Sequence, residues 1–267
     1  MSRLVRRRPD LADAPTTATV MPEAEPYYGG SGPNGVLLCH GFTGSPQSMR
    51  PWADHLEADG FRVVLPRLPG HGTTWQELNR TRWEDWYACV ERAFGDLRAD
   101  CDRVFLAGLS VGGTLALRLA ERHGEAIDGL AVVNPSLSSA DPRAKPLPVL
   151  RHVMPSLGGL SSDIALPDAV EAAYDRTPLH AAWSVTKLWA DVRQHLDRVT
   201  QPLLVFKSDQ DRVVDARSLA LIRAGVRSAD LSVVRLERSY HVATLDYDAE
   251  LIFTSSSAFF RRLAGKG

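Results

Sequence analysis

From residue 35 onward, short apolar runs alternate with longer segments in which apolar residues recur every three or four positions. Short continuous runs are typical of buried parallel strands, and the longer periodic segments are typical of helices that cover a sheet. The apolar runs are 36–39, 61–65, 104–107, 130–133, 203–206 and 231–236. The pattern predicts an α/β fold with a mostly parallel central sheet flanked by helices.

The clearest of the predicted helices follows Thr81. Its apolar side chains share one helical face, which indicates packing in the core rather than a cofactor site; they are Trp83, Trp86, Tyr87, Val90, Phe94 and Leu97. Thr81 and Glu84 have the spacing of a capping box and predict the start of this helix. Gly60 is expected to end an earlier helix. Two more helices are expected at 215–226 and 247–263.

The alternation is interrupted once, between Asn134 and His180. This stretch has no strand pattern, and many prolines and glycines separate short apolar pieces. Long insertions in compact domains are usually functional, and the apolar content argues against a merely solvated loop. We therefore predict a lid at 136–180, inserted into a core made of 26–135 and 181–267.

The first 25 residues have a different composition from the rest of the chain. Four arginines are followed by acidic residues and prolines rather than by the apolar run of a signal peptide. We expect residues 1–25 to form a flexible N-terminal arm.

Charge and cysteine content exclude several classes of function. Lys and Arg number 31 against 32 Asp and Glu, so the net charge of −1 creates no field that would attract nucleic acid. The cysteines are too few and too irregularly spaced for a disulfide framework or a zinc site, and they indicate a reducing compartment; they are Cys39, Cys89 and Cys101. No run approaches the about 18 apolar residues of a membrane span. We expect a cytoplasmic protein without stable membrane insertion.

Candidate chemistry begins with the sequence Gly-Leu-Ser-Val-Gly at 108–112, which lies between a predicted strand and a predicted helix. In this context the pattern is typical of a nucleophile elbow, a turn so sharp that its flanking positions must be glycine. Gly108, Gly112 and Gly113 meet that requirement. Ser110 is therefore the predicted nucleophile.

A serine nucleophile needs a base, and the base needs an acid to orient it. On a parallel sheet both should follow the carboxyl ends of later strands. His241 follows the last predicted strand and is the candidate base. Asp209, Asp211 and Asp215 follow the strand before it; we favour Asp211 as the acid, expect Asp215 to cap the next helix, and keep Asp209 as an alternative. The order Ser, Asp, His is that of α/β-hydrolases.

Acyl transfer also needs donors for the developing oxyanion. The backbone N–H of Val111 and that of Phe42, in the loop His40-Gly41-Phe42-Thr43-Gly44 after the first predicted strand, are the candidates. His40 and His71 also lie in glycine-rich loops, where we expect structural roles.

Five segments then carry a resemblance to a known family: HGFTGSPQSM, LPRLPGHGT, GLSVGGTLALRLAE, SDQDRVV and SYHVATLDYD. They occur in order from about residue 35 to the C-terminus, and the chain resembles bacterial monoacylglycerol lipases and small carboxylesterases of the α/β-hydrolase superfamily. The resemblance implies the same triad and oxyanion donors. It also implies that Glu171, in the lid, helps bind a glycerol head group.

Two departures from the family pattern concern substrate choice. Val111 replaces a longer side chain that is frequent after the nucleophile, and the segment PLPVLRHVMPSLGGLSSDIAL differs from the expected lid. The resemblance implies cleavage of monoacylglycerols or other single-chain esters, and the triad chemistry needs no metal or organic cofactor. We expect a monomer or homodimer whose lid contacts lipid surfaces transiently. A short- or medium-chain carboxylesterase, a thioesterase, a carbon–carbon bond hydrolase and a non-catalytic binding protein are the alternatives.

Overall fold

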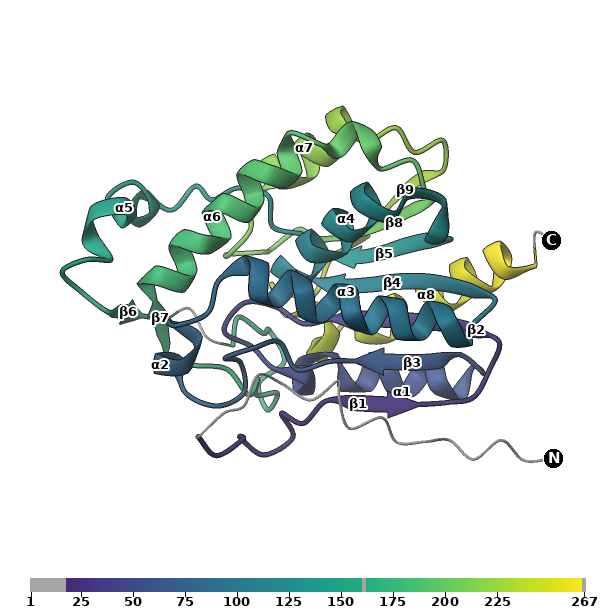
Figure 1. The fold of residues 1–267 in the computed structure, drawn as a ribbon, viewed down its shortest axis with the longest axis horizontal. Helices are drawn as coiled ribbons and strands as arrows, with labels where there is room; N and C mark the ends of the chain where they lie inside the picture. Colours follow the sequence, from purple (N-terminus) through teal and green to yellow (C-terminus); the bar gives the residue numbers. More distant parts are fainter. Residues whose placement is uncertain (1–17, 160–161, 266–267) are drawn as a thin grey trace.

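The structure is a computed structural model that describes residues 18–159 and 162–265. Within these residues, seven strands form one sheet in the order β1-β3-β2-β4-β5-β8-β9 (Figure 1). Their bounds are Tyr27–Gly29 for β1, Asn34–Cys39 for β2, Arg62–Leu65 for β3, Arg103–Leu109 for β4, Gly129–Val133 for β5, Leu203–Ser208 for β8 and Leu231–Leu236 for β9. All neighbouring strands are parallel except β1, which pairs antiparallel with β3. The predicted mostly parallel sheet is confirmed.

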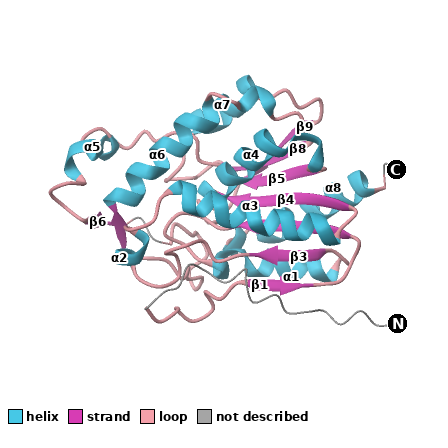
Figure 2. Ribbon diagram, viewed as in Figure 1, coloured by secondary structure: helices cyan, strands magenta, loops and turns pink. Residues whose placement is uncertain are grey.

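Helices cover both faces of this sheet (Figure 2). They are α1 (Arg50–Ala58), α2 (Trp75–Leu78), α3 (Trp83–Asp100), α4 (Val111–His123), α5 (Leu147–Leu150), α6 (Leu179–Arg193), α7 (Ala216–Gly225) and α8 (Ala249–Ala264). Short 3-10 turns lie at Pro46–Met49, Gly124–Ala126, Pro142–Ala144, Leu196–Arg198 and Ala243–Leu245.

Alternation along the central strands explains why the sheet is buried on both faces. In β4, Leu106 packs in one apolar cluster with Leu115 of α4, while its neighbour Phe105 packs in a second cluster with Trp52 of α1 and Phe260 of α8. Successive side chains of a strand point to opposite faces, so a continuous apolar run supplies both clusters. The continuous runs in the sequence therefore mark the central strands.

The start of α3 differs from the prediction. Arg82 is the N-cap, and the Asp85 carboxylate accepts its backbone N–H at 2.8 Å, so the capping box is not Thr81 with Glu84. The Thr81 hydroxyl instead donates to the Leu78 carbonyl and accepts from Trp86 Nε1. Thr81 thus closes the turn after α2, and the helix begins at Trp83.

The chain between β5 and α6, where the sequence predicts an insertion, contains structure that the sequence pattern did not show. Two short strands, β6 (Ser156–Gly158) and β7 (Arg176–Pro178), pair antiparallel. Runs of three residues with glycine and proline are too short to show alternation, so they were missed. The arrowheads of β3 and β5 point towards the side where α5, β6 and β7 lie (Figure 1). The insertion therefore stands at the carboxyl edge of the sheet.

The predicted N-terminal arm is too long at its C-terminal end. Ala24 is fully buried, and the Met21 N–H donates to the Gly72 carbonyl at 2.8 Å. Residues 18–25 therefore lie against the core, and the remaining part of the arm, 1–17, lies outside the described residues. In the part of the chain that the structure describes, no helix combines the length and the apolar character needed to span a bilayer.

Candidate active site

Ser110 lies in the turn between β4 and α4, with φ 55° and ψ −118°. A positive φ is rare for a residue with a side chain, and it occurs here where a strand passes directly into a helix. The Ser110 N–H donates to the Val133 carbonyl at 2.9 Å and holds the turn against β5. A Cβ at Gly112 would lie 2.0 Å from the Cys39 carbonyl oxygen, so this position requires glycine. The structure thus has the elbow geometry predicted for Ser110.

Asp211 and His241 come together at the ends of β8 and β9. Asp211 Oδ1 lies 3.0 Å from His241 Nδ1 and also accepts the N–H groups of Val213 and Val214 at 3.0 and 2.9 Å. The Asp211 side chain is 1% exposed and that of His241 is 10% exposed. The carboxylate therefore fixes the imidazole with Nδ1 as the donor, and it leaves Nε2 as the acceptor.

The two other aspartates that the sequence left open have different partners. Asp209 forms an exposed ion pair with Arg235, and Asp215 caps α7 by accepting the N–H of Arg217 at 2.9 Å. Of the three, Asp211 is the aspartate that contacts His241.

Burial and hydrogen bonding act in opposite directions on Asp211. Burial, the largest single influence, would raise the pKa of Asp211, but the hydrogen bond and charge of His241 and the ammonium group of Lys207 outweigh it. Together they hold the pKa of Asp211 well below its usual range. The acid is therefore ionised throughout the neutral pH range.

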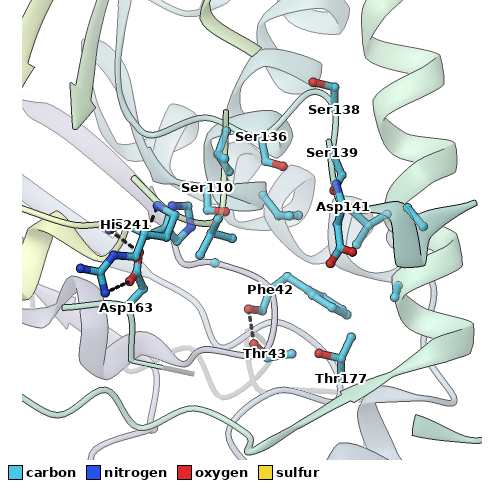
Figure 3. Close-up of a pocket in the computed structure, with 18 of the residues that line it drawn as sticks. Phe42, Thr43, Ser110, Ser136, Ser138, Ser139, Asp141, Asp163, Thr177 and His241 are labelled. Carbon is cyan, nitrogen blue, oxygen red and sulfur yellow. Dashed lines mark hydrogen bonds and ion pairs between the residues drawn. The ribbon is translucent and has the colours of Figure 1, made fainter. Parts of the chain in front are cut away.

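A cavity of about 610 Å³ lies beside Ser110 and His241 (Figure 3). The sequence-predicted site residues all line it: Phe42, Ser110, Val111, Glu171, Asp211 and His241. The volume is within the range of small-molecule sites. Apolar side chains of the insertion and of α6 line the remainder of the wall, together with several hydroxyl groups and the Asp141 carboxylate. The cavity can therefore hold an acyl chain next to Ser110.

The predicted oxyanion loop lies against the elbow. A Cβ at Gly41 would lie 3.6 Å from Ser110 Cβ, which shows how closely the loop approaches the serine. In the described part of the chain, no hydrogen bond uses the N–H of Phe42 or that of Val111. Both donors are thus available to an oxyanion.

The histidines of the two glycine-rich loops have structural contacts, as expected. His40 Nε2 accepts the Leu68 N–H at 3.1 Å, and His71 Nδ1 lies 3.2 Å from the Pro69 carbonyl oxygen. Both side chains are fully buried, and burial lowers the pKa of His40 to about 4. These rings are neutral and join the loops after β2 and β3.

Glu171 extends from the insertion to the same cavity. A Cβ at Gly44 would lie 2.6 Å from Glu171 Oε1, so the carboxylate lies against the glycine backbone of the oxyanion loop. Gln47 holds the segment on both sides, donating to the Val170 carbonyl and accepting the Ala172 N–H, each at 3.0 Å. Burial raises the pKa of Glu171 to about 6, while the charge of His241 and a backbone hydrogen bond from Ser162 oppose the shift.

Comparison with known proteins shows the family to which this chain belongs. The model of the serine aminopeptidase S33 family matches residues 33–248. The chain belongs to this family. It is a hydrolase with the α/β-hydrolase fold, as predicted.

Three relatives of this hydrolase extend the comparison. A thermostable monoacylglycerol lipase of Bacillus sp. (strain H-257) is 43% identical, with 92% of this chain and 98% of the relative covered. A carboxylesterase of Bacillus subtilis (strain 168) is 26% identical over 90% of this chain and 97% of its own. A solved structure from work on LipS and LipT, two metagenome-derived lipolytic enzymes, has a TM-score of 0.89 and 39% identity, with 91% of this chain and all of that chain covered.

Sequence reasoning missed the residues that attach the insertion of this hydrolase to the histidine loop. Asp163 Oδ2 accepts the His241 N–H at 3.2 Å and the Arg212 N–H at 3.3 Å. The buried Asp246 accepts N–H groups from both sides, Ala165 at 2.7 Å and Tyr240 at 2.9 Å. These carboxylates join segments far apart in the sequence, and no local pattern marks them.

Asn134, at the end of β5, joins the loops of the acid and the base. Its side-chain amide donates to the His241 carbonyl at 2.8 Å and accepts the Ser208 N–H at 2.9 Å. The residue is fully buried and has φ 44°, a left-handed conformation that asparagine tolerates. The main chain around His241 is therefore fixed on both sides, by Asp163 and by Asn134.

Among the described residues, one group could supply three metal ligands, namely Glu121, Asp191 and His195. Arg118 lies between the two carboxylates, 3.1 Å from Glu121 and 2.8 Å from Asp191. The guanidinium group therefore already pairs with both carboxylates, and none of the three ligand residues lines the cavity.

Proposed function

We propose that this hydrolase cleaves monoacylglycerols to a fatty acid and glycerol, with Ser110, His241 and Asp211 as the catalytic triad. The observation that carries the proposal is the hydrogen bond between Asp211 and His241 at the wall of the cavity that holds the Ser110 elbow. The 43% identity with a bacterial monoacylglycerol lipase supports the substrate class.

In the proposed reaction, His241 Nε2 accepts the Ser110 proton as Oγ attacks the ester carbonyl carbon. The N–H groups of Phe42 and Val111 stabilise the resulting oxyanion, and Asp211 stabilises the imidazolium. His241 then protonates the leaving glycerol, and an acyl-enzyme on Ser110 remains. Water attacks this ester with His241 again as the base, and the fatty acid leaves. No step requires a metal or an organic cofactor.

Glu171 would bind the glycerol side of the substrate. Its carboxylate lies beside the oxyanion loop, and with a pKa of about 6 it is mostly ionised at pH 7 and accepts hydrogen bonds from hydroxyl groups. The apolar cavity wall would take the acyl chain.

A carboxylesterase of shorter acyl chains is the second candidate. Ser138, Ser139, Asp141 and Thr177 give the cavity a polar side (Figure 3), which suits a short acyl group better than a long aliphatic chain. The carboxylesterase of Bacillus subtilis is also a relative, at 26% identity.

The insertion also supports transient contact with a lipid surface. Val149 and Val153 are 71% and 73% exposed, and Met154 is 40% exposed, all in or next to α5. Such a small apolar patch suits brief contact with the surface that presents the substrate. The cytoplasmic location and the monomeric or dimeric state stay predictions.

A substrate panel tests the proposal. We expect kcat/KM to be higher for a monoacylglycerol than for the methyl ester of the same fatty acid or for di- and triacylglycerols. Glu171→Ala should lower the monoacylglycerol value about tenfold or more, the magnitude of a hydrogen bond to a charged group, and leave the methyl ester within about threefold. Glu171→Gln, which keeps an acceptor, should fall in between. Equal losses on both esters, or a preference for the methyl ester, would favour the carboxylesterase.

A further inference from the structure

Lys207, in β8, extends along its own loop to the proposed triad acid. Its Nζ lies 2.5 Å from Asp211 Oδ2 and 2.7 Å from the Val214 carbonyl oxygen, with Asn134 Oδ1 at 3.5 Å. The Lys207 side chain is 12% exposed and that of Asp211 is 1% exposed. This is a largely buried ion pair at the catalytic carboxylate, and the proposed reaction does not use it.

The two oxygens of Asp211 have different partners. Oδ1 accepts from His241 and from two backbone N–H groups, whereas Oδ2 accepts from the Lys207 ammonium group. The imidazole and the ammonium group therefore share one carboxylate from opposite sides. Because the same Nζ also contacts the Val214 carbonyl, it ties the strand end to the loop that carries Asp211.

We propose that Lys207 is a positioning residue that fixes the Asp211 carboxylate and, through its charge, extends the activity of the enzyme to lower pH. The inference rests on the proposed triad. A cation beside the carboxylate weakens the stabilisation that Asp211 gives to the imidazolium. The charge of Lys207 therefore favours the neutral imidazole of His241, which is the form that acts as the base.

Other charged groups lie near Lys207, Asp211 and His241 and also influence the charge of the imidazole. Asp215 follows Asp211 in the same loop, and the charge of Lys207 contributes to lowering the pKa of Asp215. Asp163 and Glu171 come from the insertion, the first bonded to the His241 backbone and the second close enough to interact with its charge. Arg212 lies next to Asp211, where its guanidinium group stacks on Tyr240 at 3.8 Å. Of these groups, Lys207 is the cation bonded to the Asp211 carboxylate.

The test is the pH dependence of kcat/KM for a soluble short-chain ester from pH 5 to 9. Lys207→Met should move the acidic limb of the profile upward by on the order of one pH unit, from a unit charge a few ångströms away. Activity at pH 6 should then fall several-fold more than activity at pH 8.5. Lys207→Gln keeps a donor for the Val214 carbonyl and should shift the limb in the same direction, so the test does not depend on how well methionine is accommodated.

Arg235→Met is the matched control, because it removes a cation of β9 that pairs with the exposed Asp209, two residues before Asp211. Its profile should coincide with that of the wild type. Lys207→Arg keeps the charge and should keep the limb within about a third of a pH unit. A uniform loss at every pH in the neutral variants, or a limb displaced equally by Lys207→Arg, would overturn the inference. Loss of activity in Ser110→Ala with an unmoved limb in Lys207→Met would overturn it while leaving the proposed function intact.

Discussion

Ser110→Ala is expected to lower kcat on a short nitrophenyl ester about 10⁶-fold, as removal of the nucleophile does in other triads. Alanine fits the site because the substitution removes only a hydroxyl group. The hydrogen bond that holds the turn, from the N–H of residue 110 to the Val133 carbonyl, is kept. The backbone donors and the cavity stay in place, so substrate binding and the fold should be preserved. The loss would then report chemistry rather than unfolding.

The measurement is the initial rate together with the thermal melting temperature. Ser138→Ala is the matched control, because Ser138 also lines the cavity and its hydroxyl lies 3.4 Å from that of Ser218, away from the elbow. We expect that variant to keep its rate within about threefold. Turnover by a folded Ser110→Ala protein would refute the proposed mechanism.

Asp211→Asn is expected to lower kcat about 10⁴-fold. Oδ1 of Asp211 accepts three N–H groups, so the asparagine carbonyl oxygen must take this place and its amide group must face the ammonium group of Lys207. In that arrangement the asparagine amide and the Lys207 ammonium group, both hydrogen-bond donors, face each other. The negative charge that stabilises the imidazolium is also lost. If the amide turns over instead, it faces His241 and imposes the wrong tautomer. Both outcomes impair the base.

Two neighbouring aspartates provide controls for Asp211→Asn. Asp209→Asn removes an exposed ion pair and should leave kcat within about twofold, since exposed pairs contribute little. Asp215→Asn retains a capping side chain at the start of α7 and should also keep its rate. A large loss of kcat in either variant, with activity kept in Asp211→Asn, would show that the acid is that aspartate and not Asp211.

Hydrophobic pattern was sufficient to predict the core of the sheet. Strands such as β4 and β5 are buried on both faces, and burial on both faces requires an uninterrupted apolar run that is visible in the sequence. The edge strand β1 and the pair β6 and β7 are three residues long, so they carry no alternation to detect. The start of α3 was misplaced because Thr81 with Glu84 and Arg82 with Asp85 have the same spacing, and only the tertiary contacts of Thr81 decide between them.

The candidate site could be predicted as far as it follows strand ends. Ser110, Asp211 and His241 each follow a strand in a parallel sheet, so their meeting at one edge is a consequence of topology. The residues that hold the site together could not be found in this way. Asp163 and Gln47 bond to main-chain groups that lie far away in the sequence, and such partners are known only once the chain is folded.

The most direct measurement of the central claim is the mass of the enzyme during turnover of a monoacylglycerol, quenched in acid on the millisecond timescale and mapped by peptide. We predict an adduct with the mass of the fatty acyl group on the peptide that contains Ser110. The adduct should be absent in Ser110→Ala. Its amount should increase with the ratio of the acylation rate to the deacylation rate. A fluorophosphonate should label the same serine. Turnover of the monoacylglycerol with the acyl group on another residue, or with no fluorophosphonate adduct on Ser110, would contradict the account.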